Sequence, residues 1–187
     1  MEPIRHYPNG ELASHILGYI GKISQQDEIE KYTKDKGYSS DSFIGKTGVE
    51  ESQEVSLKGQ DGFKKVMVDN RGNRTETISE TQAVPGKNVY LSIDSDLQKV
   101  AEESLKRTLE SIRNGSEYKS KWGSYKPNES HKNATSGAVV VLDVKTGKVL
   151  ALASYPSYDP NLFVTGISNS DWISLFPEDA REDRKST

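Results

Sequence analysis

Three short stretches of this 187-residue chain combine residue types that can carry out serine acyl transfer. One is a Ser-x-x-Lys spacing from Ser116 to Lys119, and two are Lys-Thr-Gly, at residues 46–48 and 145–147. A lysine held beside a serine hydroxyl can accept its proton and so make the oxygen nucleophilic. This chemistry needs both side chains on one helix face, in surroundings that partly desolvate the lysine.

The elements expected around these stretches do not meet that need. Gly115 should end the preceding helix, so Ser116 opens a polar loop in which nothing apolar lies near Lys119. The stretch at 145–147 falls in a tight turn, and the stretch at 46–48 precedes a surface helix. We therefore interpret all three as chance matches and predict no catalytic residue in the chain.

Cofactor, metal and nucleic-acid chemistry also find no support. The chain has no cysteine, and His6, His15 and His131 lie too far apart in sequence for ligand spacing. The formal net charge of −3 argues against a nucleic-acid surface, which needs a basic face. We predict no metal ion, no cofactor and no nucleic-acid partner.

One polar segment, residues 114–136, interleaves Tyr118, Trp122 and Tyr125 with several lysines. Such a surface can combine stacking with positive charge to bind a polymer. The aromatic side chains can also simply pack against the body of the domain. We favour this second interpretation because the chain as a whole is acidic.

The hydropathy pattern predicts an α+β fold with modest cores, since only 33% of the residues are hydrophobic and 28% are charged. The strongest signal is an amphipathic helix that Asp94 or Ser95 caps and Gly115 ends. Two apolar strands, 137–143 and 149–154, follow it. Earlier and later elements are a short helix and strand within 10–21, a polar surface helix over 24–36, a connection over 37–45, a helix over 48–57 with Val49, Val55 and Leu57 as its apolar contacts, a hairpin over 63–69 and 75–81, a strand over 87–93 and a short helix over 171–176.

The composition changes near residue 87. Elements before it are polar and thinly packed, whereas a long amphipathic helix and two apolar strands come after it. We therefore predict two domains, residues 1–86, with short helices and hairpins in an elongated body, and residues 87–187.

Several ordered motifs carry a resemblance to a known family. Arg5-His-Tyr-Pro-Asn-Gly10 resembles an Arg-x-Tyr-Pro-x-Gly motif, and Ile44-Gly-Lys-Thr-Gly-Val-Glu50 resembles a Gly-x-x-Gly-Leu-Glu motif with valine in place of leucine. Residues 59–62, 68–72 and 89–98 follow in the same order, and residues 137–163 resemble a strand pair that opens a catalytic domain. The family is the class B penicillin-binding proteins, and the likeness is greatest to the penicillin-binding protein 2 type.

This resemblance implies an elongated pedestal, or dimerisation domain, over 1–86 and the first helix and strands of a transpeptidase domain over 87–187. The family's catalytic Ser-x-x-Lys lies downstream of the residues that match here. We therefore expect the chain to be a non-catalytic scaffold segment of a peptidoglycan D,D-transpeptidase. Nine residues would be structural members of the pedestal motifs: Arg5, Tyr7, Pro8, Gly10, Gly45, Gly48, Glu50, Arg71 and Gly72.

The resemblance also implies a location and partners. The parent protein would work at the extracytoplasmic face of the bacterial cytoplasmic membrane. Its anchor would lie outside this chain, because no apolar run here approaches the ~20 residues that span a bilayer. The expected partners are a SEDS-family glycosyltransferase and rod-shape scaffold proteins. A homodimer is a further possible assembly. Since Arg5 and Glu50 lie in motifs that the family brings together, we predict a charge-assisted hydrogen bond between them.

Two other functions stay open at this point. The chain could be a stand-alone module that binds the cell wall or another polymer through residues 114–136. It could also be a β-lactam-reactive enzyme that uses Ser116.

Overall fold

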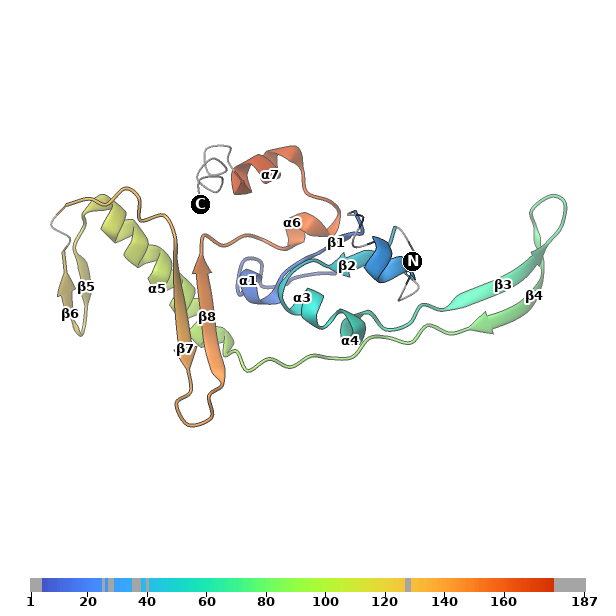
Figure 1. The fold of residues 1–187 in the computed structure, drawn as a ribbon, viewed down its shortest axis with the longest axis horizontal. Helices are drawn as coiled ribbons and strands as arrows, with labels where there is room; N and C mark the ends of the chain where they lie inside the picture. The colour runs from blue at the N-terminus through green and yellow to red at the C-terminus, as the bar shows by residue number, and fades with distance from the viewer. Residues whose placement is uncertain are drawn as a thin grey trace.

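The molecule is elongated in the computed structural model, with a β-hairpin at one end and a long helix toward the other (Figure 1). The structure describes residues 5–24, 26, 29–34, 38–39, 41–126 and 129–176. The strands in these residues form four separate two-stranded antiparallel sheets. Helices and sheets are mixed along the chain, which confirms the predicted α+β class.

A small body forms the middle of the molecule. Its elements are α1 (Ser14–Leu17), β1 (Ile20–Lys22), the π-helix η1 (Ile29–Lys34), β2 (Phe43–Gly45), α3 (Gly48–Ser52) and α4 (Glu54–Lys58). Strand β1 pairs with β2, from Ile20 opposite Gly45 to Lys22 opposite Phe43. Ile23, Tyr32 and Ile44 make a buried apolar cluster on this pair.

Two expectations for this body were wrong. The segment 37–45 was predicted as a connection, but it contains β2, whose three residues complete the sheet with β1. The segment 24–36 was predicted as a helix on the surface, but Tyr32 of η1 is buried in the apolar cluster. Ile29 of η1 and Tyr38 pack against the same cluster, so a few apolar and aromatic side chains hold this polar segment on the small core.

The predicted helix over 48–57 is divided in two. Helices α3 and α4 meet at Gln53, and Val55, expected as an apolar contact, is exposed. The side chains that these helices bury are carboxylates, Glu50 and Glu54.

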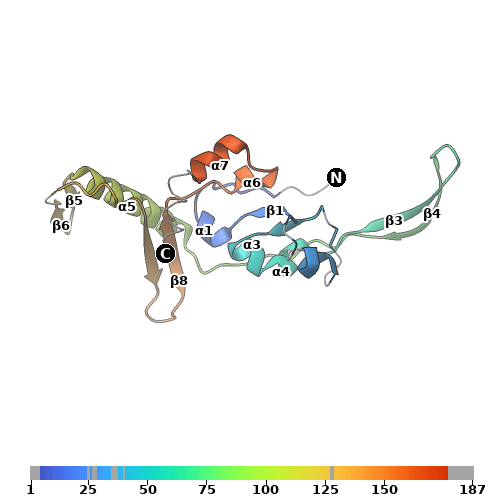
Figure 2. The same ribbon diagram turned by 45° about the horizontal axis from the view of Figure 1, so that its top comes forward.

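Beyond α4 the chain makes the predicted hairpin of β3 (Phe63–Val68) and β4 (Arg74–Thr81). It projects away from the rest of the molecule in both ribbon views (Figures 1 and 2). All eight residues of β4 and five of the six residues of β3 are exposed, so burial does not distinguish the two faces of this hairpin. The ladder is therefore held by its own pairing and turn.

The second body packs the long helix α5 (Ser95–Asn114) on the hairpin of β7 (Gly137–Leu142) and β8 (Val149–Tyr155). Asp94 caps α5 by accepting from the backbone N–H groups of Asp96 and Leu97, and Gly115 ends it with a φ of 64°. Ala101 of α5 meets Ala151 and Ala153 of β8, which are both 0% exposed. Small residues at the contact let the helix backbone approach the sheet closely.

The strand predicted over 87–93 is absent, because this extended segment makes no ladder with a neighbour. It runs toward the outer edge of β8, where the Ser92 hydroxyl donates to the Val149 carbonyl and the Asp94 N–H donates to the Leu150 carbonyl. Gln98, 0% exposed, then bonds both the N–H and the C=O of Leu152 through its amide. A side chain thus fills the place of the missing strand at this edge.

The loop predicted over 114–136 contains a further hairpin of β5 (Tyr118–Ser120) and β6 (Gly123–Tyr125). The tail then forms α6 (Asn161–Val164) and α7 (Asn169–Leu175), the second of them near the predicted position. None of the helices in the described parts of the chain is long and apolar enough to cross a membrane.

Candidate functional site

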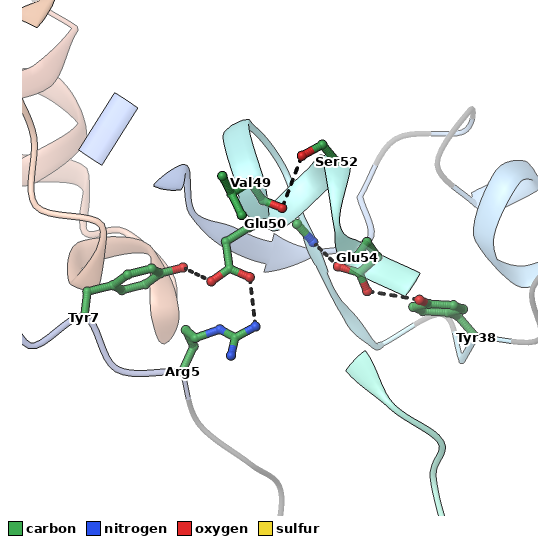
Figure 3. A network of polar contacts seen from close by, with 8 residues as sticks. Arg5, Tyr7, Tyr38, Val49, Glu50, Ser52 and Glu54 are labelled. Carbon is green, nitrogen blue, oxygen red and sulfur yellow. Dashed lines mark hydrogen bonds and ion pairs between the residues drawn. The ribbon is translucent and has the colours of Figure 1, made fainter. Parts of the chain in front are cut away.

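The first predicted motif contact is present. Glu50, only 7% exposed, accepts hydrogen bonds from Arg5 Nη2 at 2.8 Å and from the Tyr7 hydroxyl at 3.2 Å (Figure 3). The predicted bond between Arg5 and Glu50 is thereby confirmed. Burial, and then the negative charge of Glu50, raise the pKa of Tyr7 well above its ordinary value, so its hydroxyl remains a donor.

A second carboxylate network lies one helical turn further along. Glu54, also 7% exposed, accepts from the Gly45 N–H at 2.7 Å and from the Tyr38 hydroxyl at 3.0 Å (Figure 3). Burial, followed by the charge of Glu54, raises the pKa of Tyr38. The sequence motifs indicate no role for Glu54 or Tyr38, although the spacing of four residues between Glu50 and Glu54 favours one shared face.

Two of the predicted motif glycines are required by close backbone contacts. A Cβ on Gly45 would lie 2.1 Å from the backbone carbonyl of Glu50. A Cβ on Gly48, whose φ is +62°, would lie 2.5 Å from the Ile16 carbonyl. Only glycine permits these approaches, which set α3 against β2 and against α1.

The other predicted motif residues divide into two groups. Pro8 and Gly10 belong to the turns that lead into α1, where the Gly10 N–H donates to the Tyr7 carbonyl at 3.2 Å. Arg71 and Gly72 lie far from them, at the tip of the β3–β4 hairpin (Figure 1). There Asp69 accepts from the Arg71 N–H at 2.8 Å, and hydrogen bonds from Asn73 are the main reason that the pKa of Asp69 is lowered. The structure thus brings seven of the nine residues together and places two in a separate turn.

Asn161 and Glu102 join this N-terminal region to the tail and to α5, and neither residue was predicted as part of a site. The side chain of Asn161 accepts from the Tyr7 N–H at 3.0 Å and donates to the Tyr7 carbonyl at 2.9 Å. Glu102 of α5 accepts from the Ala13 N–H at 2.9 Å. Asn161 lies within the Asp-Pro-Asn-Leu-Phe segment that carried part of the resemblance, but its partner could not be read from the sequence.

Aromatic side chains strengthen the same contact. Tyr19 stacks on Phe163 with ring centroids 4.0 Å apart, and Tyr158 packs edge-on against both. The Tyr158 hydroxyl donates to the Ser14 carbonyl at 3.1 Å, and a ring nitrogen of His15 lies 2.8 Å from the Pro156 carbonyl. We call these contacts of residues 7–19 with Glu102 and residues 156–163 the junction.

The three stretches that matched serine acyl-transfer motifs lie apart from one another. Ser116 is exposed just past the end of α5, and Lys119 is ion-paired with Glu117 at 3.2 Å. Residues 145–147 form the turn between β7 and β8, where hydrogen bonds, chiefly from Thr146, lower the pKa of Asp143. Residues 46–48 lead into α3. Lys119 lies in strand β5, where a loop was expected, the 145–147 stretch lies in the expected turn, and Gly48 is the first residue of α3.

The hydrogen bonds of this region link several segments of the chain. The buried carboxylates hold donors from the N-terminal segment, β2 and the η1 region, and the junction then fixes that assembly to α5 and the tail. Within the described residues, no three His, Asp or Glu side chains gather in a way that could hold a metal ion.

Two family models match the two parts of the chain that the junction joins. Residues 1–91 match the penicillin-binding protein dimerisation domain, and residues 137–181 match the penicillin-binding protein transpeptidase domain. The chain belongs to the penicillin-binding proteins.

Relatives within the penicillin-binding proteins point to one branch of the family. The peptidoglycan D,D-transpeptidase MrdA of Haemophilus influenzae is 38% identical over 179 residues, which are 95% of this chain and 23% of the relative. The protein of the same name from Escherichia coli K12 is 37% identical over 174 residues, 91% of this chain and 23% of the relative. The chain therefore spans about a quarter of the length of these curated relatives.

A solved penicillin-binding protein structure has the same arrangement. The complex between penicillin-binding protein PBP2 and MreC from Helicobacter pylori aligns with a TM-score of 0.63 and 28% identity, over 95% of this chain and 27% of that chain. The resemblance to the penicillin-binding protein 2 type is thereby confirmed, and no comparison supports a stand-alone binding module.

Proposed function

We propose that this chain is a non-catalytic scaffold segment of a peptidoglycan D,D-transpeptidase of the penicillin-binding protein 2 type. In this proposal residues 1–86 form the pedestal and residues 87–187 form the first elements of the transpeptidase domain. The segment positions the catalytic domain at the extracytoplasmic face of the cytoplasmic membrane. The peptidoglycan chemistry itself belongs to the parent protein.

The junction is the observation that carries this proposal. The side chain of Asn161 bonds both backbone groups of Tyr7, and Tyr7 in turn bonds the buried Glu50. Residue 7 lies in the part that matches the dimerisation domain, and residue 161 lies in the part that matches the transpeptidase domain. A scaffold that positions a catalytic domain needs such a firm attachment between the two parts.

Replacing Asn161 with Ala tests the scaffold role. Both Tyr7 backbone groups lose their partner, so we expect the two parts of the chain to unfold separately in urea, whereas the unchanged chain unfolds in a single transition. Asn169→Ala, at the exposed start of α7, is the matched control. Two separate transitions in the unchanged chain would contradict the scaffold proposal.

The proposed partners are a rod-shape scaffold protein and a SEDS-family glycosyltransferase, and self-association stays open. Support for the first comes from the relative that was solved together with MreC. Titrating the fluorescently labelled chain with a purified MreC-type protein should give saturable binding. Absence of binding at concentrations well above a micromolar would contradict this part of the proposal.

The non-catalytic part of the proposal has its own test. Incubation with a fluorescent penicillin should leave the chain unlabelled, because Lys119 is engaged by Glu117 and no described contact holds it against Ser116. An adduct on Ser116, located by mass spectrometry and absent from Ser116→Ala, would overturn it.

A further inference from the structure

The hairpin of β5 and β6 presents a tryptophan that the described residues of the chain leave largely uncovered. Trp122, in the turn of the hairpin, is 87% exposed, and Tyr125 of β6 is 61% exposed. The other tryptophan, Trp172, packs against Phe176 with ring centroids 4.5 Å apart. The expectation that the aromatic side chains of this segment pack against the body is therefore wrong for Trp122 and Tyr125.

The hairpin is held in place at its base and in its turn. The Ser116 N–H donates to the Ser111 carbonyl and the His131 N–H to the Ile112 carbonyl, so both ends of the segment are tied to the last turn of α5. In the turn, the Ser120 hydroxyl donates to the Gly123 carbonyl and accepts from the Trp122 N–H. The tryptophan is thus presented on an ordered support, which reduces the entropy that binding costs.

The charge of the hairpin is opposite to that of the chain. Residues 115–126 contain three lysines and one glutamate, while the chain has a net charge of −3. Lys119 pairs with Glu117, but no described carboxylate pairs with Lys121 or Lys126. Lys121 Nζ lies 4.8 Å from the centroid of the Trp122 ring, which places a cation beside the exposed indole.

The amino-acid composition of the hairpin segment indicates which class of ligand it can bind. Residues 115–136 contain no Val, Ile, Leu, Met or Phe. Insertion into a membrane needs a broad apolar face, and a stable protein interface needs an apolar centre. A segment without these residues therefore suits neither a membrane nor a protein partner. Exposed aromatic rings with unpaired lysines and small polar residues suit an acidic glycan, whose sugar rings stack on aromatic faces and whose carboxylates bind ammonium groups.

We propose that the β5–β6 hairpin is an accessory binding surface for an acidic glycan, and that its occupant is a peptidoglycan strand with its stem-peptide carboxylates. The identity of the glycan rests on the proposed function. In the sequence, the hairpin lies between the two parts that the family models match, residues 1–91 and 137–181. It is a contact on the polymer in addition to any made by the catalytic domain of the parent protein.

Co-sedimentation of the complete chain with purified peptidoglycan sacculi tests this surface. We expect Trp122→Ala to weaken binding roughly tenfold, as for the loss of one well-placed aromatic contact. Lys121→Glu should weaken binding as well and should make it less sensitive to salt. Tyr90→Ala and Lys145→Glu, at exposed positions outside the hairpin, are the matched controls and should bind like the unchanged chain.

A spectroscopic measurement reports on the hairpin directly. Trp172→Phe leaves Trp122 as the sole indole of the chain, and its emission should change on titration with soluble peptidoglycan fragments but not with a neutral chitin oligosaccharide. Circular dichroism of each variant checks that the fold is kept.

Three outcomes would overturn the proposal: no binding of the unchanged chain to sacculi, equal binding by Trp122→Ala, or binding only to anionic lipid vesicles. None of them would bear on the scaffold role, which the unfolding of Asn161→Ala tests separately.

Discussion

The two bodies of this protein close their interiors by different means. The N-terminal body buries two carboxylates, Glu50 and Glu54, and each is satisfied by hydrogen bonds from tyrosine and either arginine or a backbone N–H. The body of α5, β7 and β8 packs small apolar residues at its helix–sheet contact, and its buried polar side chain, Gln98, is a neutral amide.

This difference determines which kind of substitution should destabilise each body most. A carboxylate that serves several donors is sensitive to loss, because its removal leaves buried polar groups without partners. A contact between alanines is sensitive to added volume, because the backbones on both sides already touch. Removal of a group is therefore the sharpest test of the first body, and addition of volume is the sharpest test of the second.

The largest effect is expected from Ala153→Leu. Ala153 is 0% exposed against α5, and three more carbon atoms there should lower the free energy of unfolding by about 3 kcal/mol. Ala138→Leu, on an exposed position of β7, is the matched control and should change it by less than about 0.5 kcal/mol. Urea unfolding measures both, and equal losses would show that the contact with α5 is loose.

A smaller loss is expected from Glu54→Ala. The Gly45 N–H and the Tyr38 hydroxyl both lose their acceptor, which should cost about 2 kcal/mol. Glu54→Gln should cost less, because the amide oxygen can still accept from Gly45. The control is Glu51→Ala on the exposed side of α3. If the control loses as much as Glu54→Ala, the buried network does not explain the result, because alanine is itself a strong helix former.

Tyr7→Phe should lower the free energy of unfolding by about 1 kcal/mol at neutral pH, since Glu50 loses one of its two donors. The substitution should also change the alkaline pH dependence. The pKa of Tyr7 is raised above the ordinary 10.0 in the folded protein, so its stabilising effect is complete below pH 10. Above that pH the unfolded chain loses the tyrosine proton while the folded chain keeps it.

In that alkaline range Tyr7 should therefore reduce stability by up to about 1.4 kcal/mol per pH unit. Tyr7→Phe should remove this part of the slope between pH 10 and 11, measured by urea unfolding, whereas the exposed control Tyr90→Phe should not. An unchanged slope in Tyr7→Phe would mean that Tyr7 ionises as easily in the folded protein as in the unfolded one.

The smallest effect is expected in the β3–β4 hairpin, which belongs to neither body. Ile78 of β4 is exposed, so Ile78→Ser should change the free energy of unfolding by less than about 0.5 kcal/mol. Val139→Ser, on the side of β7 that packs on α5, should cost about 2 kcal/mol. A large loss at Ile78 would reveal that the hairpin is covered in solution, for example by a second copy of the chain.

Local patterns predicted the elements that are stabilised locally. Helix α5 has a capping aspartate, an apolar stripe and a terminal glycine, and each was visible in the sequence. The β3–β4 and β7–β8 hairpins have alternating or apolar strands around glycine-containing turns. The Arg5–Glu50 bond was predicted only because both residues lie in motifs of a known family.

Elements that depend on distant partners could not be predicted in this way. Strand β2 is three residues long and exists because β1 lies beside it. The segment 87–93 has a strand-like composition, but the side chain of Gln98 occupies part of the edge at which a strand would pair. The roles of Glu54 and Asn161 depend on backbone groups that the folded chain brings to them.

By itself the sequence determined the mixed fold class, the long helix, the principal hairpins and the family, because capping, periodicity and ordered motifs are properties of neighbouring residues. The tertiary structure alone decided that two carboxylates are buried, that Asn161 holds the backbone of Tyr7, and that Trp122 stays exposed. The reason is physical: burial and hydrogen bonding of these side chains are set by groups from 9 to 154 residues away in the chain, or by their absence.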